Sequence, residues 1–283
     1  MRARESVRGG VRRVLGVLAV ALMAAPLLWG AGGCTKEQQI VPATPMPSKV
    51  FDLPTLMEFI RSDSRLWGTL EADCSVVVRT PQLSVPGGQV SFARGRLQIE
   101  KPGKIKLEAV EGQRRVTLTG DGSAYRVELP AFGDAYQGNY GDPLPAQPRR
   151  ILFMPDDVVM VWDWSNLFVG KAPVLKNMPG AAVIDTLDLV SEPAPAVKVV
   201  NSVSFNPATH QVTSLTKFDT NGTVRVQIAY GPYQTVEGPD KQPVQVPRTV
   251  RITYPTSWTA IQIELRNIKV NEKLPEGTFD LKS

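Results

Sequence analysis

Residues 94–108 read RGRLQIEKPGKIKLE, and this stretch decides the fold class. Its apolar residues Leu97 and Ile99, and then Ile105 and Leu107, are each separated by one polar or charged residue. Such alternation places the apolar side chains on one face of a β-strand. Pro102-Gly103 lies between the two runs and is typical of a turn. The stretch therefore predicts two antiparallel strands that share one apolar and one polar face.

The same two-residue period continues on both sides of this hairpin. Val76 and Val78 belong to a run before it, and Ile261 and Ile263 belong to a run near the end of the chain. We count about ten such runs, separated by turn sequences such as Asp121-Gly122. An antiparallel sheet with one face on the core and the other in water produces this pattern. The sequence predicts a mainly β (α+β) domain built on one antiparallel sheet.

Two segments have a helical period instead. Leu53–Ser64 follows Asp52, a favourable capping residue, and has apolar residues at helical spacing, which predicts an N-terminal amphipathic helix. Pro155–Val169 begins with Pro-Asp-Asp, a favourable helix start, and is apolar on almost every side. The second segment predicts a central helix that covers the sheet as a lid, either packed in the core or lying against lipid. Its apolar residues include Val158, Val159, Trp162 and Phe168.

The first residues have the pattern of an export signal. Residues 1–13 carry five arginines and one glutamate, the apolar run Val14–Trp29 follows, and small residues lead to Cys34. A positive region, a short apolar region and small residues before a cleavage point are typical of a secretory signal peptide. The alternative is a retained transmembrane anchor, but the run is shorter than the ~20 residues that a spanning helix needs. We therefore predict a signal peptide over residues 1–33.

The cleavage point gives this signal a more specific interpretation. Ala31-Gly32-Gly33-Cys34 resembles the lipobox of bacterial lipoproteins, although Ala31 stands where leucine is commoner. The resemblance implies that Cys34 carries lipid and attaches the chain to a membrane, since several acyl chains anchor a protein stably. An ordinary signal-peptidase site beside an incidental cysteine is the alternative. Residues 34–50 follow as a lipidated cysteine and a proline-rich tether, and residues 51–283 form the domain.

Charge and residue inventory exclude several function classes. Residues 1–33 carry +4 of the formal net charge of +5, so the remaining chain carries +1 and lacks the basic excess of a nucleic-acid-binding domain. His210 is the only histidine, and Cys74, the second cysteine, lies on the apolar side of a strand as a small buried residue. We find no catalytic constellation, no metal site and no cofactor motif, and we predict that the chain is not an enzyme.

Three motifs resemble the LolA/LolB lipoprotein-localisation superfamily. The hairpin at 94–108 is similar to the one that opens the sheet in that family, and Asp121-Gly122 stands where the family has a turn. Residues 270–281, VNEKLPEGTFDL, are similar to the family's closing segment. The resemblance covers residues 51–283 in order. It implies an open antiparallel half-barrel whose apolar concave face is covered by helices and binds acyl chains of lipoproteins or other lipids.

The resemblance and the alternating pattern together give a set of candidate cavity residues. They are Val76, Val78, Leu97, Ile99, Ile105, Leu107, Val158, Val159, Trp162, Phe168, Ile261 and Ile263. The same residues would fill a solid core equally well, so an envelope lipoprotein with a structural or protein-binding role is the alternative. The expected partners are a membrane, lipid or lipoprotein acyl chains, or an envelope protein. Because Thr35 rather than aspartate follows Cys34, we expect the outer membrane, with the domain facing the periplasm.

Overall fold

The computed structural model describes residues 52–81, 83, 86–130, 134–140, 155–164, 167–178, 180–190 and 196–281. The proposed signal peptide, Cys34 and the tether lie outside these described residues. No helix in the part that is described is long and apolar enough to cross a bilayer.

The described chain is mostly β-strand. Two α-helices are present, α1 (Leu53–Arg65) and α2 (Pro155–Met160), with short 3-10 turns at Pro86–Gly88 and Pro255–Ser257. The first six strands are β1 (Thr69–Arg79), β2 (Gln89–Glu100), β3 (Lys104–Glu111), β4 (Arg114–Asp121), β5 (Ala124–Leu129) and β6 (Asp134–Asn139). The remaining strands are β7 (Ala172–Met178), β8 (Ala181–Val190), β9 (Ala196–Phe205), β10 (Val212–Phe218), β11 (Val224–Tyr230), β12 (Tyr233–Glu237), β13 (Pro243–Pro247), β14 (Thr249–Tyr254) and β15 (Thr259–Val270).

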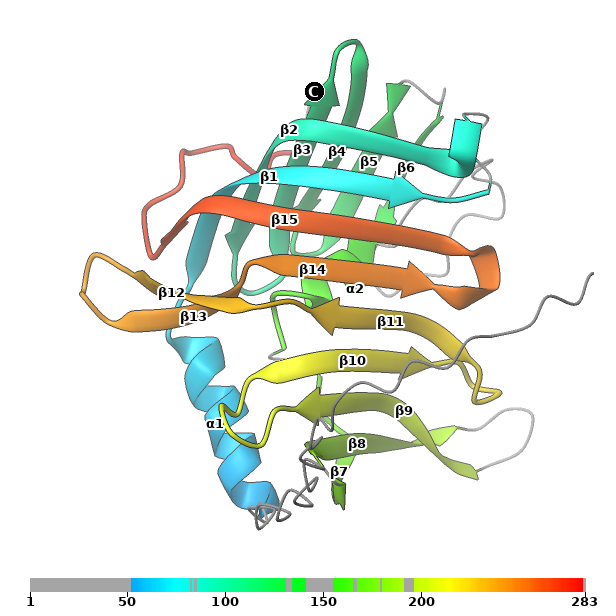
Figure 1. The fold of residues 1–283 in the computed structure, drawn as a ribbon, viewed down its shortest axis with the longest axis vertical. Helices are drawn as coiled ribbons and strands as arrows, with labels where there is room; N and C mark the ends of the chain where they lie inside the picture. Colours follow the sequence, from blue (N-terminus) through cyan, green and yellow to red (C-terminus); the bar gives the residue numbers. More distant parts are fainter. Residues whose placement is uncertain are drawn as a thin grey trace, which may run out of the picture. The chain divides into compact units, whose positions relative to one another are not determined.

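Thirteen strands form one open antiparallel sheet (Figure 1). Their order is β6-β5-β4-β3-β2-β1-β15-β14-β11-β10-β9-β8-β7, and β12 pairs with β13 in a separate two-stranded ribbon. The first and last strands of the chain, β1 and β15, are therefore neighbours in the middle of the sheet. The predicted open antiparallel sheet is confirmed, whereas the count of about ten strands is wrong. Strands β6, β7, β12 and β13 are among those that the alternating pattern does not indicate.

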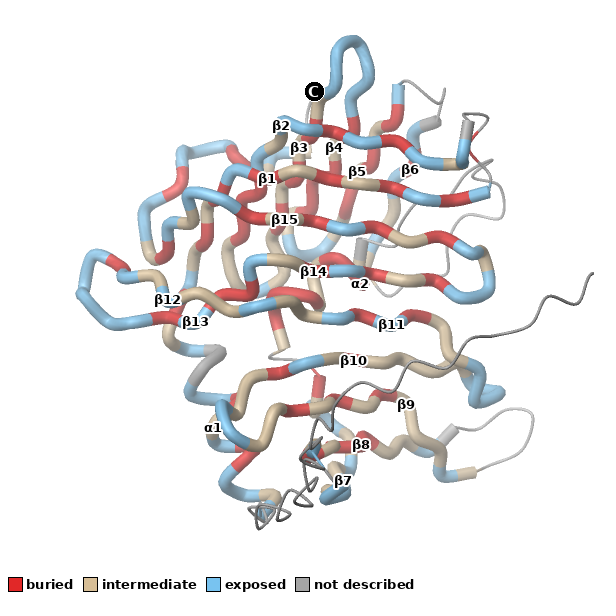
Figure 2. Tube along the Cα trace, viewed as in Figure 1, coloured by how far each residue is buried: buried red, intermediate tan, exposed pale blue. Residues whose placement is uncertain are grey.

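The sheet has one apolar and one polar face, as the two-residue period predicts. Burial alternates along β1, where every second residue is buried, and the same alternation is visible along most strands in Figure 2. We call the side that carries Val76 and Leu97 the apolar face, and the side that carries Glu71 and Arg96 the polar face. The core of the domain lies on the apolar face.

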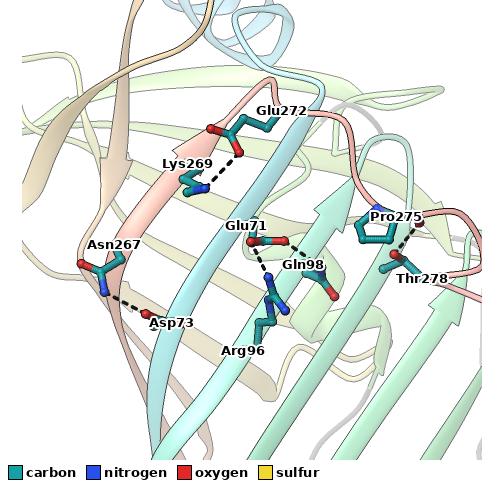
Figure 3. A network of polar contacts seen from close by, with 9 residues as sticks. All are labelled: Glu71, Asp73, Arg96, Gln98, Asn267, Lys269, Glu272, Pro275 and Thr278. Carbon is teal, nitrogen blue, oxygen red and sulfur yellow. Dashed lines mark hydrogen bonds and ion pairs between the residues drawn. The ribbon is translucent and has the colours of Figure 1, made fainter.

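The polar face is held together by contacts between neighbouring strands (Figure 3). The Glu71 carboxylate accepts a hydrogen bond from Arg96 at 2.7 Å and another from Gln98 at 2.8 Å. The Asn267 amide donates to Asp73 at 2.8 Å, which links β15 to β1. The hydrogen bond from the Arg96 guanidinium holds the pKa of Glu71 below its ordinary value. These contacts fix the register at the middle of the sheet.

The helix α1 begins where the sequence predicts and ends within one residue of the predicted end. The Asp52 carboxylate caps it by accepting a hydrogen bond from the Thr55 backbone N–H at 2.9 Å. The apolar stripe of the helix is buried, and its Phe59 ring meets His210 edge to face at 5.5 Å. His210, the single histidine of the sequence, is half-buried beside α1.

Asn271 connects the end of β15 to the end of α1. Its side-chain oxygen accepts a hydrogen bond from Gly68 N–H at 2.8 Å, and its amide donates to the Leu66 carbonyl at 3.0 Å. The backbone of Asn271 has φ 57°, in the left-handed region that asparagine tolerates better than most residues. The closing segment that resembles the family motif thus starts at a residue that joins both ends of the domain.

Candidate functional site

The eight strand residues of the candidate set lie together on the apolar face. Val76 stands opposite Ile263 and Val78 opposite Ile261 across β1 and β15. On the neighbouring strands β2 and β3, Leu97 stands opposite Leu107 and Ile99 opposite Ile105. None of these eight side chains is more than 3% exposed. The structure therefore brings them into one continuous apolar layer across four adjacent strands.

The predicted central helix over Pro155–Val169 is wrong beyond Met160. The helix α2 has six residues, and the chain then continues through turns in which both Trp162 N–H and Asp163 N–H donate to the Val159 carbonyl at 3.0 Å. β-Branched and aromatic residues, which make up most of this run, have only modest helix propensity. A lid helix is therefore not present in the described segment, and the run is apolar because it packs against the sheet.

The four candidates from this segment nevertheless join the same core. Val158 and Trp162 are buried, at 1% and 4% exposure, and Val159 and Phe168 are partly buried against the core cluster. The structure thus assembles all twelve candidate residues into one apolar cluster.

A buried carboxylate attaches this segment to one half of the sheet. Asp157, in the first turn of α2, is completely buried. It lies 3.1 Å from the Lys217 ammonium on β10 and 2.7 Å from the Arg225 guanidinium on β11. The register between these strands shifts at Arg225, and a bulge of this kind can redirect a side chain. The sequence pattern predicts Asp157 only as a helix-start residue and does not predict these two ion pairs.

Polar contacts also hold the other end of the segment. The Asp163 carboxylate accepts a hydrogen bond from Gly103 N–H, in the β2–β3 turn, at 3.2 Å. Trp164 donates through its indole N–H to the Tyr230 hydroxyl at 3.2 Å, and that hydroxyl donates to the Val161 carbonyl at 3.1 Å. Burial raises the pKa of Tyr230, so this hydroxyl stays protonated and remains a donor. Residues 157–164 are therefore fixed both to the β2–β3 turn and to β10 and β11, on opposite sides of the β1–β15 pair.

The same region contains an aromatic pocket that the sequence did not indicate. We use this name for the small cavity, of about 20 Å³, that is lined by Trp67, Lys101, Trp162, Trp164, Tyr233 and Gln245, among others. These residues come from the α1–β1 connection, the β2–β3 turn, the segment after α2 and the β12–β13 ribbon. A cavity of this size holds about one water molecule. Trp67, Trp162 and Trp164 are the sequence feature that could have indicated this pocket. The sequence does not show that they meet, because tertiary structure brings them together.

Cys74 is buried, as its place on the apolar side of a strand predicts. Burial raises the pKa of its thiol to about 12, which keeps the sulfur protonated and unreactive at neutral pH. Within the described residues, no group of three or more His, Cys, Asp and Glu side chains is placed to hold a metal ion.

The fold is similar to that of solved protein structures. A DUF1329 family protein from Desulfovibrio piger ATCC 29098 superposes with a TM-score of 0.54 at 10% sequence identity, over 80% of this chain and 95% of its own. A LolA superfamily protein from Nitrosomonas europaea superposes with a TM-score of 0.52 at 9% identity, over 81% of this chain and 98% of its own. The sequence matches no protein-family model and none of the curated proteins compared with it. The chain therefore shares its fold with these two proteins, one of which is a LolA superfamily protein.

Proposed function

We propose that the chain is a membrane-anchored lipoprotein whose half-barrel binds the acyl chains of lipids or lipoproteins in cell-envelope transport or lipoprotein localisation. The observation that carries this proposal is the continuous apolar layer of β1, β2, β3 and β15, extended by the segment after α2. Acyl chains are recognised by apolar surface alone, at about 0.8 kcal/mol for each buried CH₂ group. The likeness to a LolA superfamily protein supports the same use of the fold.

Lipid binding can be tested on the domain expressed without residues 1–34. The domain would be stripped of lipid and titrated with a fluorescent fatty acid, and lipid extracted before stripping would be identified by mass spectrometry. We expect saturable binding that Val159→Asn weakens strongly, because Val159 is only partly buried and can be changed without emptying the core. Val197→Asn is the matched control, since that valine is 67% exposed on β9. Absence of both uptake and co-purified lipid would refute the proposal.

The membrane anchor is tested separately. Growth with labelled palmitate should label the full chain, and Cys34→Ser should abolish the label and release the protein into the soluble envelope fraction. Cys74→Ala is the matched control because Cys74 is buried inside the sheet. Separation of inner and outer membranes then tests the proposed location at the outer membrane, with the domain facing the periplasm. Label that persists in Cys34→Ser would contradict lipidation at this cysteine.

An envelope lipoprotein with a protein-binding role and a filled core is the second candidate. Four exposed apolar side chains favour it, on three neighbouring strands at one edge of the sheet: Val174, Met178, Leu189 and Val197. Exposed apolar side chains that gather on one surface often mark an interaction site. A specific partner lost with Leu189→Ser and Val197→Ser, but retained with Val159→Asn, would favour this function. Fatty-acid uptake with no partner would favour acyl-chain binding.

A further inference from the structure

The turn between β14 and β15 carries an exposed tryptophan in an unfavourable backbone conformation. The Trp258 side chain is 81% exposed, so it buries little apolar surface. Its backbone has φ 54°, in the left-handed region that ends the Pro255–Ser257 turn, where glycine or asparagine is usual. A tryptophan that is neither buried nor suited to its backbone conformation does not stabilise the fold. Such residues cluster at functional sites.

Trp258 borders an open hollow of about 490 Å³ at one end of the sheet. The rest of its described lining comes from the end of β1 and the connection to β2: Arg79, Thr80, Pro81, Leu83, Gly87 and Gly88. Arg79 stands opposite Ala260, two residues after Trp258, so the two turns are neighbours (Figure 1). A buried hydrogen bond of 3.0 Å between the Thr80 and Thr259 hydroxyls joins them. The volume lies in the usual range of small-molecule sites, about 300–1,000 Å³.

Two arginines at this end of the sheet have no acidic partner among the described residues, Arg79 and Arg251. Arg79 donates through Nε to the Gln89 side-chain oxygen at 2.8 Å, which holds the guanidinium in place and leaves its two terminal nitrogens for a ligand. Arg79 and Arg251 also line one shallow depression on the polar face, together with Gln262. Guanidinium groups bind carboxylate and phosphate oxygens through two parallel hydrogen bonds. The pair therefore favours a ligand with a negative charge.

The open indole face and the two guanidinium groups place different demands on a ligand. The indole offers an apolar surface for stacking, whereas the arginines require oxygen acceptors. A sugar ring has C–H groups on its faces and oxygen atoms around its edge, and a carboxylate or phosphate on the sugar supplies the charge. The hollow is open to solvent, so the other hydroxyl groups of such a ligand would stay in water. An acyl chain would leave the arginines unused, and a free inorganic anion would leave the indole unused.

We propose that Trp258, Arg79 and Arg251 form a binding site for an acidic saccharide, with the sugar ring on the indole and the acidic group on the arginines. None of these three residues belongs to the apolar core cluster. The inference therefore goes beyond the proposed function and does not depend on acyl-chain binding.

The experiment screens the full chain carrying Cys34→Ser against an array of saccharides. The array holds oligogalacturonates and muramyl saccharides as carboxylates, phosphomannans as phosphates, and maltotriose and chitotriose as neutral sugars. We expect at least one acidic saccharide to bind, and calorimetry should show about tenfold weaker binding of its methyl ester or dephosphorylated form. Trp258→Asn should weaken binding about tenfold, whereas Trp258→Tyr, which keeps an aromatic face, should retain most of it. Arg79→Gln and Arg251→Gln should each reduce the preference for the acidic form.

Arg94→Gln is the matched control, because Arg94 is an exposed arginine of β2 that lines neither the hollow nor the depression. Asparagine tolerates the left-handed region, so Trp258→Asn should keep or raise the melting temperature, which separates loss of binding from loss of folding. If no acidic saccharide on the array binds, or if binding is unaffected by Trp258→Asn, the inference is overturned. Inorganic phosphate that binds as tightly as the saccharides would also overturn it, as would binding to phosphatidylglycerol vesicles alone. Each of these results would leave the proposed acyl-chain binding intact.

Discussion

Replacing Asp157 with asparagine tests whether its two ion pairs hold α2 and the turns that follow it against the sheet. The substitution keeps the size of the side chain and removes its charge. Lys217 and Arg225 then lose the carboxylate that lies 3.1 Å and 2.7 Å away. We expect the domain to be destabilised, and the contacts of residues 157–164 with the sheet to be weakened most.

The size of the effect follows from the exposure of the three groups. Removing one partner of a fully buried ion pair costs about 3–5 kcal/mol, because the other charge remains buried and unpaired. Here the carboxylate is completely buried, but the side chains of Lys217 and Arg225 keep 21% and 37% of their surface exposed. Water can therefore solvate the two cations in the variant, and we expect a loss of about 2 kcal/mol.

The assay is urea denaturation followed by circular dichroism. With a slope of about 2–3 kcal/mol per molar urea, the expected loss lowers the midpoint by roughly 0.7–1 M. Arg225→Met should cost less on its own, because Asp157 keeps Lys217 as a partner, and the double variant should lose less than the sum of the two. Asp188→Asn is the matched control: this aspartate pairs with Lys171 at 3.4 Å on the surface and should cost less than about 0.5 kcal/mol.

Two results would refute this reasoning. An Asp157→Asn variant as stable as the control would show that the ion pairs do not hold the segment. Strict additivity with Arg225→Met would show that the two side chains do not interact in solution.

Three further predictions concern the middle of the sheet. Gly95→Ala would place a Cβ atom 2.6 Å from the Glu108 carbonyl oxygen and 2.9 Å from the Cys74 sulfur. This clash should lower the stability of the domain by about 1–3 kcal/mol, as measured by thermal melts. An unchanged melting temperature would contradict the close packing. Burial raises the pKa of the Cys74 thiol to about 12, so Cys74 should resist iodoacetamide at pH 8 until denaturant is added. Mass spectrometry follows the labelling. Rapid labelling of the native protein would contradict the burial of Cys74. The hydrogen bond from Arg96 lowers the pKa of Glu71 in the folded state. As the pH falls, Glu71 is therefore protonated in the unfolded protein before it is protonated in the folded protein. Its contribution to stability is present above its ordinary pKa and is lost as the pH falls through its folded pKa. Glu71→Gln should remove that part of the acid dependence in urea titrations at several pH values, and an unchanged dependence would contradict it.

The sequence was sufficient to predict the apolar layer, because a two-residue period assigns each side chain of a strand to one face. Val76, Leu97 and Ile263 required no knowledge of strand order to be placed on the apolar side. Several shorter strands were not counted, because Pro173 in β7, Gly138 in β6 and the brevity of β12 and β13 obscure the period. In these strands pairing with neighbours, rather than local pattern, determines the structure.

The segment after α2 shows a different limit. Its apolar character correctly predicted burial, but burial on all sides does not require a helix. The turn beyond Met160 is set by contacts with distant residues: Asp157 meets Lys217 and Arg225, which are 60 and 68 positions away. The aromatic pocket is formed in the same way, from four separated stretches of chain. Such convergence depends on sheet order, which alternation in a single sequence does not specify.

The adjacency of β1 and β15 has a consequence for the biogenesis of the protein. The Gly68–Asn271 hydrogen bond beside this pair joins residues 203 positions apart, so the centre of the sheet cannot form until almost the whole chain is available. Contacts of such large sequence separation are slow to form. If the chain is exported from its N-terminus, as its first residues predict, β15 crosses the membrane long after β1. Until β15 arrives, the edge of β1 that pairs with it is exposed. An exposed strand edge promotes aggregation, so a chaperone that shields strand edges would be most useful at this stage.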